Sequence, residues 1–462
     1  MGFKPLMRST PFEQGVAPSA IEDLEAAFWR SKAQMRGFIL LRHGKVIAEK
    51  YWNPYKANDK VWVYSISKSF TSTAIGLAVG EGKISLNDKA ASFFPDRLPE
   101  AVSDNLRNMS IHDLLSMACG HEYDSAPYIF NAPEGDWIKS FMSLPVPYEP
   151  GSHFIYDSGA SFILSAIVQK ATGGKLLDYL KPRLFDKLGF DEAMWDESPE
   201  GISTGGWGIM VRLEDLAKLG QLYLNKGKYA GESILSEEWV DAATRKQTDN
   251  DGENPDWSQG YGYQFWRCRH NAYRADGAYG QYCIVMPDQD AVLAVMSETR
   301  DMQELLDIVW DVLLPAFDGA QSPIEKKLNA KAYRLEENPY GLSSASFFFG
   351  DASATVSLHG KESSYTVSAG RTNWLDWHIP PTLAFWSLTP VFGLKDEVSK
   401  ASARFVWTSE SELEMFWVYR SMPHRGKLKV IFSDGSIEMV WPANEIAESV
   451  GGADIRICGR LG

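Results

Sequence analysis

Tyr64-Ser65-Ile66-Ser67-Lys68-Ser69-Phe70 is the stretch on which the interpretation of this chain depends. It follows a short extended run at 61–64 and opens a segment, 65–79, whose apolar residues recur at helical spacing. Two glycines, Gly80 and Gly82, then predict the end of that helix. Ser65 is expected at the helix start with Lys68 three residues on, so the hydroxyl and the amine would share one face.

A serine at this position has two physical advantages as a nucleophile. The N–H groups of a first helical turn have no partner within the helix and can face a developing oxyanion. The helix dipole also favours negative charge at that end. The alternative is that Ser65 caps the helix and Lys68 is a solvated side chain, because a chain of this length should contain on the order of one Ser-x-x-Lys match by chance.

The composition is that of a large acidic protein. Its 462 residues are 44% hydrophobic, enough for a sizeable core, and the length predicts two or three domains. The net charge of -14 argues against nucleic acid or an anionic membrane as a main partner, since both need a basic footprint. No apolar run approaches the roughly 20 residues of a membrane helix, and the N-terminus lacks an apolar signal segment. We therefore expect a cytoplasmic protein with no membrane partner.

Cysteine and histidine spacing indicates neither a metal site nor a redox site. The 4 cysteines form no C-x-x-C pair and are typical of free thiols in a reducing compartment. The 8 histidines form no H-E-x-x-H motif. Glycine motifs that bind phosphates or dinucleotides are also missing. We expect no metal and no cofactor.

Strands at both ends of the first 315 residues enclose a mostly helical middle. Apolar runs at 37–41 and 46–51 flank a turn and predict a hairpin. Further strands are expected at 262–267, 281–286 and 291–296, before a closing helix at 302–314. This order predicts an α+β domain with one antiparallel sheet built from both sequence ends, flanked by helices and carrying a helical insertion.

The character of the chain changes after Pro315. The run Asp318-Gly-Ala-Gln-Ser-Pro323 predicts a linker. Short β-rich runs separated by turn residues recur from about residue 344 and predict an all-β barrel or sandwich. We therefore place two domains at 1–320 and 321–462.

A second candidate for chemistry is Tyr156-Asp157-Ser158, between a Pro-Gly turn and a predicted helix. A phenol beside a lysine ammonium can have a depressed pKa and act as a general base. Ser158 could donate a hydrogen bond to the substrate or to the lysine. The alternative is that Tyr156 is a packing residue with its hydroxyl in water.

The third candidate is Ala275-Asp276-Gly277-Ala278-Tyr279-Gly280-Gln281, ahead of a predicted strand. Glycine beside a strand often marks a close approach of the backbone to a ligand. The N–H of Ala278 could then be a second oxyanion donor, opposite that of Ser65. The alternative is an ordinary turn between strands.

A competing nucleophile occurs in Gly201-Ile202-Ser203-Thr204-Gly205, which matches the G-x-S-x-G elbow. That elbow needs a strand directly before the serine and a helix directly after it. Neither is predicted here, so we do not favour Ser203.

Taken together, these segments resemble the serine β-lactamase and penicillin-binding-protein superfamily, on its class C and esterase side. Ser65-x-x-Lys68, Tyr156-x-Ser158 and Gly277-Ala278-Tyr279-Gly280-Gln281 occur in the order of that family. The resemblance covers roughly residues 20 to 315. It implies a Ser65 acyl-enzyme, proton transfer by Lys68 and Tyr156, and an oxyanion hole formed by the N–H groups of Ser65 and Ala278. Similar hydrolases also carry a lipocalin-like β-domain after the catalytic part.

Two departures from the family pattern bear on the substrate. Ala275, Asp276 and Gly277 stand where the family often has Lys or His, a small residue and Gly, so the cation that grips a substrate carboxylate is missing. Ser158 replaces the more usual Asn. Both departures favour a neutral ester or amide.

The residues expected to contact the substrate come from separate segments, and Tyr64 and Phe154 are expected beside them in the cleft wall. They are Ser158, His121, Trp207, Gly277 and Tyr279.

The sequence leaves three functions open. The first is a serine hydrolase of small esters or amides, with a small molecule as its only expected partner. The second is a class C-like β-lactamase or a D-amino-acid peptidase. The third is a penicillin-binding or sensor protein that is acylated without turnover. The sequence fixes no oligomeric state.

Overall fold

The structure is a computed structural model with two compact units, 1–10 with 23–311 and 11–22 with 312–462. It describes residues 4–16, 18–317, 324–329, 331–350, 353–361, 364–371, 374–378, 400–409, 411–420, 425–443 and 453–462. The predicted linker at 318–323, which contains the predicted domain boundary, lies outside these ranges. In the described ranges, every helix is too short or too polar to cross a lipid bilayer.

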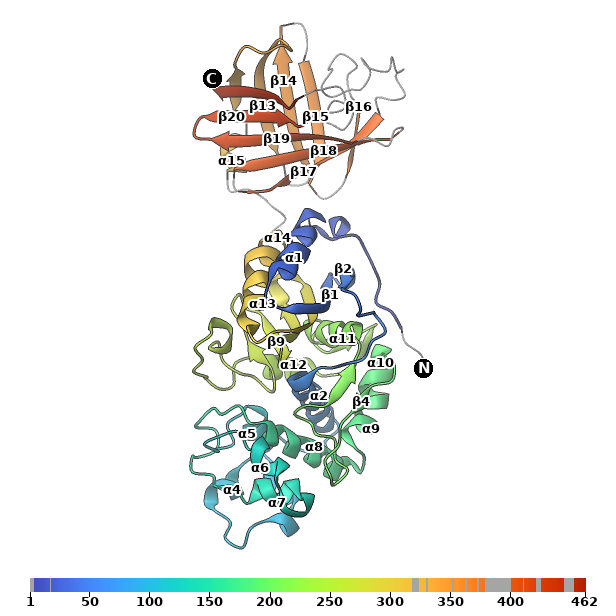
Figure 1. The fold of residues 1–462 in the computed structure, drawn as a ribbon, viewed down its shortest axis with the longest axis vertical. Coiled ribbons are helices and arrows are strands. Elements are labelled where there is room, and N and C mark those ends of the chain that lie inside the picture. Colours follow the sequence, from blue (N-terminus) through green and yellow to red (C-terminus); the bar gives the residue numbers. More distant parts are fainter. Residues whose placement is uncertain are drawn as a thin grey trace. The chain divides into compact units, whose positions relative to one another are not determined.

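The first unit is built on a six-stranded sheet in the order β2-β1-β11-β10-β9-β8, with antiparallel neighbours throughout (Figure 1). Its strands are β1 (Gln34–Arg42), β2 (Lys45–Tyr51), β8 (Trp266–Arg267), β9 (Tyr273–Gly277), β10 (Gln281–Met286) and β11 (Ala291–Glu298). The hairpin β1–β2 comes from one end of the unit's sequence and the other strands come from the other end. This confirms the predicted α+β arrangement.

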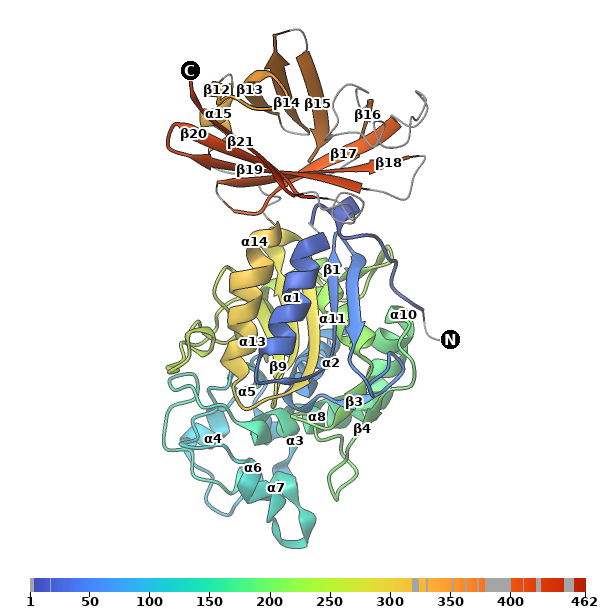
Figure 2. The ribbon, with the colours of Figure 1, turned by 45° about the horizontal axis from the view of Figure 1, so that its top comes forward.

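Both faces of this sheet are covered, and the strand alternation decides which residue faces which layer. Cys283 donates its thiol hydrogen to the carbonyl of Leu216 in α11 (Leu213–Leu224) at 3.2 Å. The adjacent Tyr282 points to the opposite face and donates its hydroxyl to the carbonyl of Met302 in α13 (Met302–Ile308) at 2.8 Å. Figure 2 shows α13 beside α1 (Pro18–Arg30) in front of the sheet. Helices on both faces explain why β10 is buried along its whole length.

The middle of the unit's sequence is helical, as predicted. The helices α4 to α7 lie together at one end of the unit (Figure 1). Its helices are α2 (Ser67–Gly80), α3 (Ala90–Phe93), α4 (Asp104–Asn108), α5 (Ile111–Leu115), α6 (Ala126–Phe130), α7 (Trp137–Met142), α8 (Ser158–Thr172), α9 (Leu176–Leu180), α10 (Asp186–Leu188) and α12 (Glu237–Thr244). The helix α2 packs against α8 within one large apolar core. These two helices begin at the first two candidate segments, so their packing brings those segments together.

Small strands complete the unit. A three-stranded sheet has the order β3-β5-β4, and β6 pairs with β7. The strands are β3 (Val61–Trp62), β4 (Met194–Trp195), β5 (Ile209–Val211), β6 (Lys228–Tyr229) and β7 (Glu232–Ser233).

Within the six-stranded sheet, the predictions for individual strands differ from the structure in two places. The strand expected at 262–267 is reduced to β8, while β9 forms without having been predicted as a strand.

The second unit is a closed β-barrel, so the barrel alternative is confirmed over the sandwich. Nine strands run β15-β14-β13-β12-β21-β20-β19-β18-β17, and a β15–β17 pairing closes the ring (Figure 2). A tenth strand, β16, pairs with β17. The strands are β12 (Ala332–Leu335), β13 (Leu342–Phe349), β14 (Ser353–Gly360), β15 (Ser364–Gly370), β16 (Leu375–His378), β17 (Lys400–Trp407), β18 (Glu412–Tyr419), β19 (Arg425–Ser433), β20 (Ser436–Trp441) and β21 (Ile455–Leu461).

Alternating burial along the strands fills this barrel with apolar side chains, as period-two patterning requires. The short helix α15 (Glu325–Leu328) is tied to the barrel by Glu325, which accepts hydrogen bonds from Arg371 at 2.8 Å and from the Trp407 indole at 2.5 Å. The helix α14 (Leu314–Phe317) precedes it.

Candidate active site

Ser65 lies in a tight turn rather than inside the helix. The 3-10 turn η2 (Tyr64–Ile66) follows β3, and α2 begins two residues later than predicted. Tyr64 has a positive φ of 49°, and the Ser67 hydroxyl donates to its carbonyl at 2.6 Å, which holds this sharp entry into α2. Ile66, not Ser65, occupies the N-cap position of α2, and no side chain caps that helix. The capping interpretation of Ser65 therefore fails.

Lys68 is buried, so it is not the solvated side chain of the alternative interpretation. Only 1% of it is exposed, and its Nζ lies 3.1 Å from Ser65 Oγ, 3.2 Å from Ser158 Oγ and 2.9 Å from the Gly206 carbonyl oxygen. Burial lowers the pKa of Lys68 to about 8, against the opposing influence of nearby carboxylates. About a tenth of these amines are then neutral at pH 7 and able to accept a proton.

Tyr156 lies beside this pair, just before α8. The ammonium of Lys68 lies 4.7 Å from the centre of the phenol ring, which stacks on Trp266, and the hydroxyl is hydrogen-bonded to Ser65. The predicted depression of its pKa is wrong. Burial, together with the negative charge of Asp276, raises the pKa of Tyr156 instead. The phenol therefore stays protonated, and Lys68 is the better proton acceptor.

The third segment forms the strand β9 and a turn at 278–280. A Cβ on Gly277 would lie 2.2 Å from the Val63 carbonyl oxygen, so only glycine allows this approach. Gly277 thus makes a close backbone approach to the chain itself, and its approach to a ligand stays a prediction. This contact places Gly277 against Val63, two residues before Ser65. Ala278 is the next residue after Gly277.

The acid of this segment is paired with Arg274. Their side chains lie on one face of β9, opposite Ala275, as the alternation of a strand requires. Arg274 is fully buried, and its Nε donates to Asp276 Oδ2 at 2.9 Å. Its guanidinium also stacks over Trp257 at 4.3 Å. Arg274 is thus committed to Asp276 and does not replace the missing family cation at the position of Ala275.

Asp157 anchors the start of α8 between Tyr156 and Ser158. Its Oδ1 accepts the N–H groups of Gly159 at 2.9 Å and of Ser125 at 3.0 Å. Burial alone would raise the pKa of Asp157, but hydrogen bonds from His121 and Ser125 hold it below its ordinary value. This carboxylate fixes the backbone from which the two neighbouring side chains point to Lys68.

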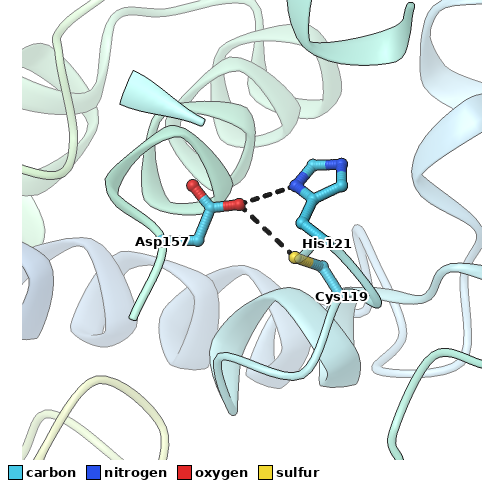
Figure 3. A group of neighbouring side chains, drawn as sticks. All are labelled: Cys119, His121 and Asp157. Atoms are coloured by element: carbon cyan, nitrogen blue, oxygen red, sulfur yellow. Dashed lines mark hydrogen bonds and ion pairs between the residues drawn. The ribbon is translucent and has the colours of Figure 1, made fainter. Parts of the chain in front are cut away.

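Figure 3 shows His121, a predicted substrate contact, beside the carboxylate of Asp157. Its Nδ1 lies 2.8 Å from Asp157 Oδ2, its ring is 1% exposed, and the thiol of Cys119 lies 3.4 Å from the same oxygen. The three side chains could in principle surround an ion, since their ligand atoms lie within 4.8 Å of one another. Burial raises the pKa of Cys119, however, and a metal needs the thiolate. The hydrogen bonds among the three side chains fit a structural support better, and contact with a substrate stays a prediction for His121.

Trp207 lies on the other side of Lys68, directly after Gly206. Its ring is half-buried and meets Phe130 edge-on at 5.0 Å and Trp137 at 5.9 Å. Phe130 is 52% exposed, which makes this aromatic group a candidate wall for an apolar substrate. Phe130 was not among our predicted residues, because nothing in its local sequence separates it from a core phenylalanine.

Ser158 Oγ lies 3.2 Å from Lys68 Nζ, and the Ser158 N–H donates to Asp124 at 2.8 Å. Asp124 was also not predicted, and burial raises its pKa. Tyr279 lies on the opposite side with a positive φ of 67°, 43% exposed, and its ring lies 5.3 Å from Tyr64. The structure thus brings Ser65, Lys68, Tyr156 and Ser158 into one group.

The competing serine lies in a different environment. Ser203 forms an isolated bridge with Glu197, has no strand directly before it or helix directly after it, and is 1% exposed. The elbow geometry is therefore missing at Ser203.

The low pKa of Lys68 predicts a pH dependence. If the neutral amine accepts the proton of Ser65, kcat/KM for ester hydrolysis should rise as the ammonium deprotonates, with a midpoint near pH 8. Initial rates between about pH 6 and 10, corrected for spontaneous hydrolysis, would measure this. A flat profile would contradict the assignment, and so would a rise that begins only near the ordinary lysine value.

Three relatives have hydrolytic names. A 6-aminohexanoate-dimer hydrolase from Paenarthrobacter ureafaciens is 25% identical over 289 residues, which make up 57% of this chain and 72% of that protein. A D-aminopeptidase from Brucella anthropi is 30% identical over 200 residues, 37% of this chain and 35% of that protein. A lovastatin esterase from Penicillium rubens is 23% identical over 164 residues, 31% of this chain and 41% of that protein.

Similarity to solved structures extends over both units. The octameric penicillin-binding protein homologue from Pyrococcus abyssi aligns over 95% of this chain and 99% of that chain, with a TM-score of 0.52 and 14% identity. At that identity the similarity concerns the fold. The sequence profile of the family described as Beta-lactamase matches residues 21–313. Since this match covers well over half of the chain, the protein belongs to the β-lactamase family.

Proposed function

We propose that the protein is a serine hydrolase that cleaves small esters or amides through an acyl-enzyme on Ser65. One observation carries the proposal. The Nζ of Lys68 is buried 3.1 Å from Ser65 Oγ, and its pKa is lowered to about 8. A lysine in that state can activate a serine without a histidine.

The groups around Ser65 support each proton transfer of acylation. The neutral amine of Lys68 takes the hydroxyl proton while Ser65 Oγ bonds to the substrate carbonyl carbon. The N–H groups of Ser65 and Ala278 hold the oxyanion in this proposal. The protonated phenol of Tyr156 gives its proton to the leaving oxygen or nitrogen, and the Lys68 ammonium restores it. The carbonyl–leaving-group bond then breaks.

Deacylation uses Lys68 in the same way, with water in place of the Ser65 hydroxyl. A water molecule gives a proton to the neutral amine of Lys68 and attacks the acyl carbon. The bond to Ser65 Oγ breaks, the Lys68 ammonium returns a proton to that oxygen, and the acid leaves. The hydrogen bond from Lys68 to the Gly206 carbonyl keeps the amine in place through both halves.

The third segment favours an ester or amide over a β-lactam. Ala275 and Asp276 supply no cation beside Gly277, and Arg274 is committed to Asp276. The names of the relatives include an esterase and a dimer hydrolase. A D-amino-acid peptidase is the second candidate, supported by the 30% identity to a D-aminopeptidase over 200 residues.

A substrate panel combined with covalent labelling tests the proposal. We expect p-nitrophenyl butyrate to be hydrolysed faster than nitrocefin and faster than the p-nitroanilide of D-alanine. A fluorophosphonate should add one group to the intact protein, and peptide mass spectrometry should locate it on Ser65. Faster turnover of the D-alanine anilide would favour the peptidase. A stable penicillin adduct without any turnover would favour the penicillin-binding alternative.

A further inference from the structure

A cavity lies against the segments that carry the proposed oxyanion donors. It measures about 920 Å³, which is ample for a small molecule. Its walls come from the start of β1, the residues before Ser65, the turn after β9 and the end of β11. Tyr64, directly before Ser65, and Tyr279, directly after Ala278, form part of its lining. In the proposal below, a substrate bound at Ser65 reaches the cavity by extending past these two rings.

The charged lining of the cavity is mostly basic, although the chain as a whole carries a net charge of -14. Its basic side chains are Lys32, Arg36, Lys60 and Arg300, and its acidic side chains are Glu298 and Asp301. In a strongly acidic protein, such a local excess of cations is a candidate anion site.

Not all of these cations are neutralised. Lys32 lies 3.0 Å from Asp301, whereas Arg36 reaches Glu298 only at 3.8 Å. Neither Lys60 nor Arg300 forms an ion pair with any carboxylate in the described ranges.

Arg36 has a further unused donor. Its Nε is buried, with no hydrogen-bond partner among the described residues. Buried donors normally find an acceptor, so a ligand oxygen is a natural partner for it.

The aromatic rings give the cavity an apolar entrance. The ring centres of Trp62 and Tyr64 are 4.7 Å apart, and those of Tyr64 and Tyr279 are 5.3 Å apart. Trp62 and Tyr279 are both partly exposed, at 38% and 43%. An aliphatic chain could lie along these rings while a charged end reaches the cations beyond them.

We propose that this cavity, which we call the basic pocket (Arg36, Lys60, Tyr64, Tyr279 and Arg300), binds a carboxylate at the far end of the substrate. The substrate class is then an ester or amide whose scissile carbonyl is separated from a carboxylate by a short aliphatic chain. This inference rests on the proposed function. It refines the expectation of a neutral substrate. The cation missing at Ala275 argues against a carboxylate beside the scissile bond, but it does not bear on a carboxylate farther away along the substrate.

The carboxylate could belong to the acyl part or to the leaving group, and two substrate pairs distinguish these. The acyl pair is the p-nitrophenyl monoester of adipic acid and p-nitrophenyl hexanoate, which have equal carbon numbers. The leaving-group pair is N-butyryl-5-aminopentanoate and N-butyrylpentylamine. We expect one pair to show a preference of about tenfold or more in kcat/KM for the carboxylate, as charge-assisted hydrogen bonds would give. The pair that responds identifies the side.

Variants of the basic pocket connect that preference to its cations. Lys60→Met, Arg300→Met and their combination should reduce the preference stepwise, because kcat/KM should fall for the carboxylate member of the pair far more than for the neutral member. The dependence of the preference on salt should weaken as well. The matched control is Lys170→Met combined with Lys228→Met, two exposed lysines outside the pocket, and it should retain the preference.

The outcomes separate the two proposals. Turnover of the neutral substrates with no preference in either pair, or with a preference that survives in the Lys60→Met/Arg300→Met variant, overturns the basic pocket and leaves the proposed function standing. Absence of turnover for all four substrates, together with an unlabelled Ser65, overturns the proposed function itself.

Discussion

Replacing Ser65 by alanine is expected to lower kcat/KM for p-nitrophenyl butyrate by at least about 10⁴-fold, because no other group can form the acyl-enzyme. The loss should appear in kcat, with the labelling by fluorophosphonate abolished. The fold should remain, since the Ser65 hydroxyl accepts from Lys68 and caps no helix. Circular dichroism and the thermal unfolding midpoint would verify this.

Ser203→Ala is the matched control for that experiment. Ser203 is the serine of the G-x-S-x-G match, is buried, and is surrounded by loop backbone in place of the strand–turn–helix of an elbow. Activity within a few-fold of the wild type is expected. If Ser203→Ala were inactive while folded, or Ser65→Ala retained activity, the assignment of the nucleophile would be wrong.

Replacing Lys68 by methionine should cost about 10³-fold or more in kcat, which is within the range for removal of a general base. Methionine has a similar length but accepts no proton, so Ser65 stays a neutral alcohol. Labelling of Ser65 should slow by a comparable factor, since the same activation is needed for attack on the phosphorus. Rates of hydrolysis and of labelling are the two measurements.

The stability of Lys68→Met should change much less than its activity. A shift of the Lys68 pKa from 10.5 to about 8 means that the folded state disfavours the ammonium by about 3 kcal/mol. For a base with a lowered folded pKa, this penalty is present at pH 7 and disappears as the pH rises from about 8 towards 10.5. Methionine removes the penalty but leaves the Gly206 carbonyl without its donor, which costs about 1–3 kcal/mol. The unfolding midpoint of Lys68→Met at pH 7 should therefore stay within a few degrees of the wild type.

Lys218→Met separates the loss of a base from the loss of any buried lysine. Lys218 is also fully buried, and its Nζ lies 2.9 Å from the Gly189 carbonyl and 3.6 Å from Asp215. This variant should retain the wild-type kcat per folded molecule, even if it unfolds more easily. An equal loss of activity in both variants would indicate a general packing effect and argue against Lys68 as the base.

The sequence could predict those parts of the site that depend on local periodicity. Helical spacing placed the Lys68 amine near the Ser65 hydroxyl. The hairpin at 37–51 and the strand at 281–286 follow from short-range patterns as well. These features need little information beyond the residues that form them.

Features that depend on tertiary packing were not predictable. The pKa of Tyr156 moves upward because α8, β9 and Trp266 together remove the phenol from water and place Asp276 near it. The burial of His121 depends on Asp157, which is 36 residues away in sequence. The strand β9 escaped prediction because Asp276 and Gly277 have low β-propensity. Its pairing with β10 makes this segment a strand in spite of that propensity.

The antiparallel pairing of β1 with β11 has a consequence for how the protein is made. Its register joins Gln34 to Glu298, so the central strands meet only after almost the entire first unit has left the ribosome. Such distant contacts are closed at a high cost in chain entropy and are typically formed slowly. During synthesis, α2 can form as a local helix, but β9 and the turn with Ala278 reach Ser65 late. Ser65, the proposed nucleophile, is thus present in the nascent chain long before the residues from β9 that surround it in the folded protein.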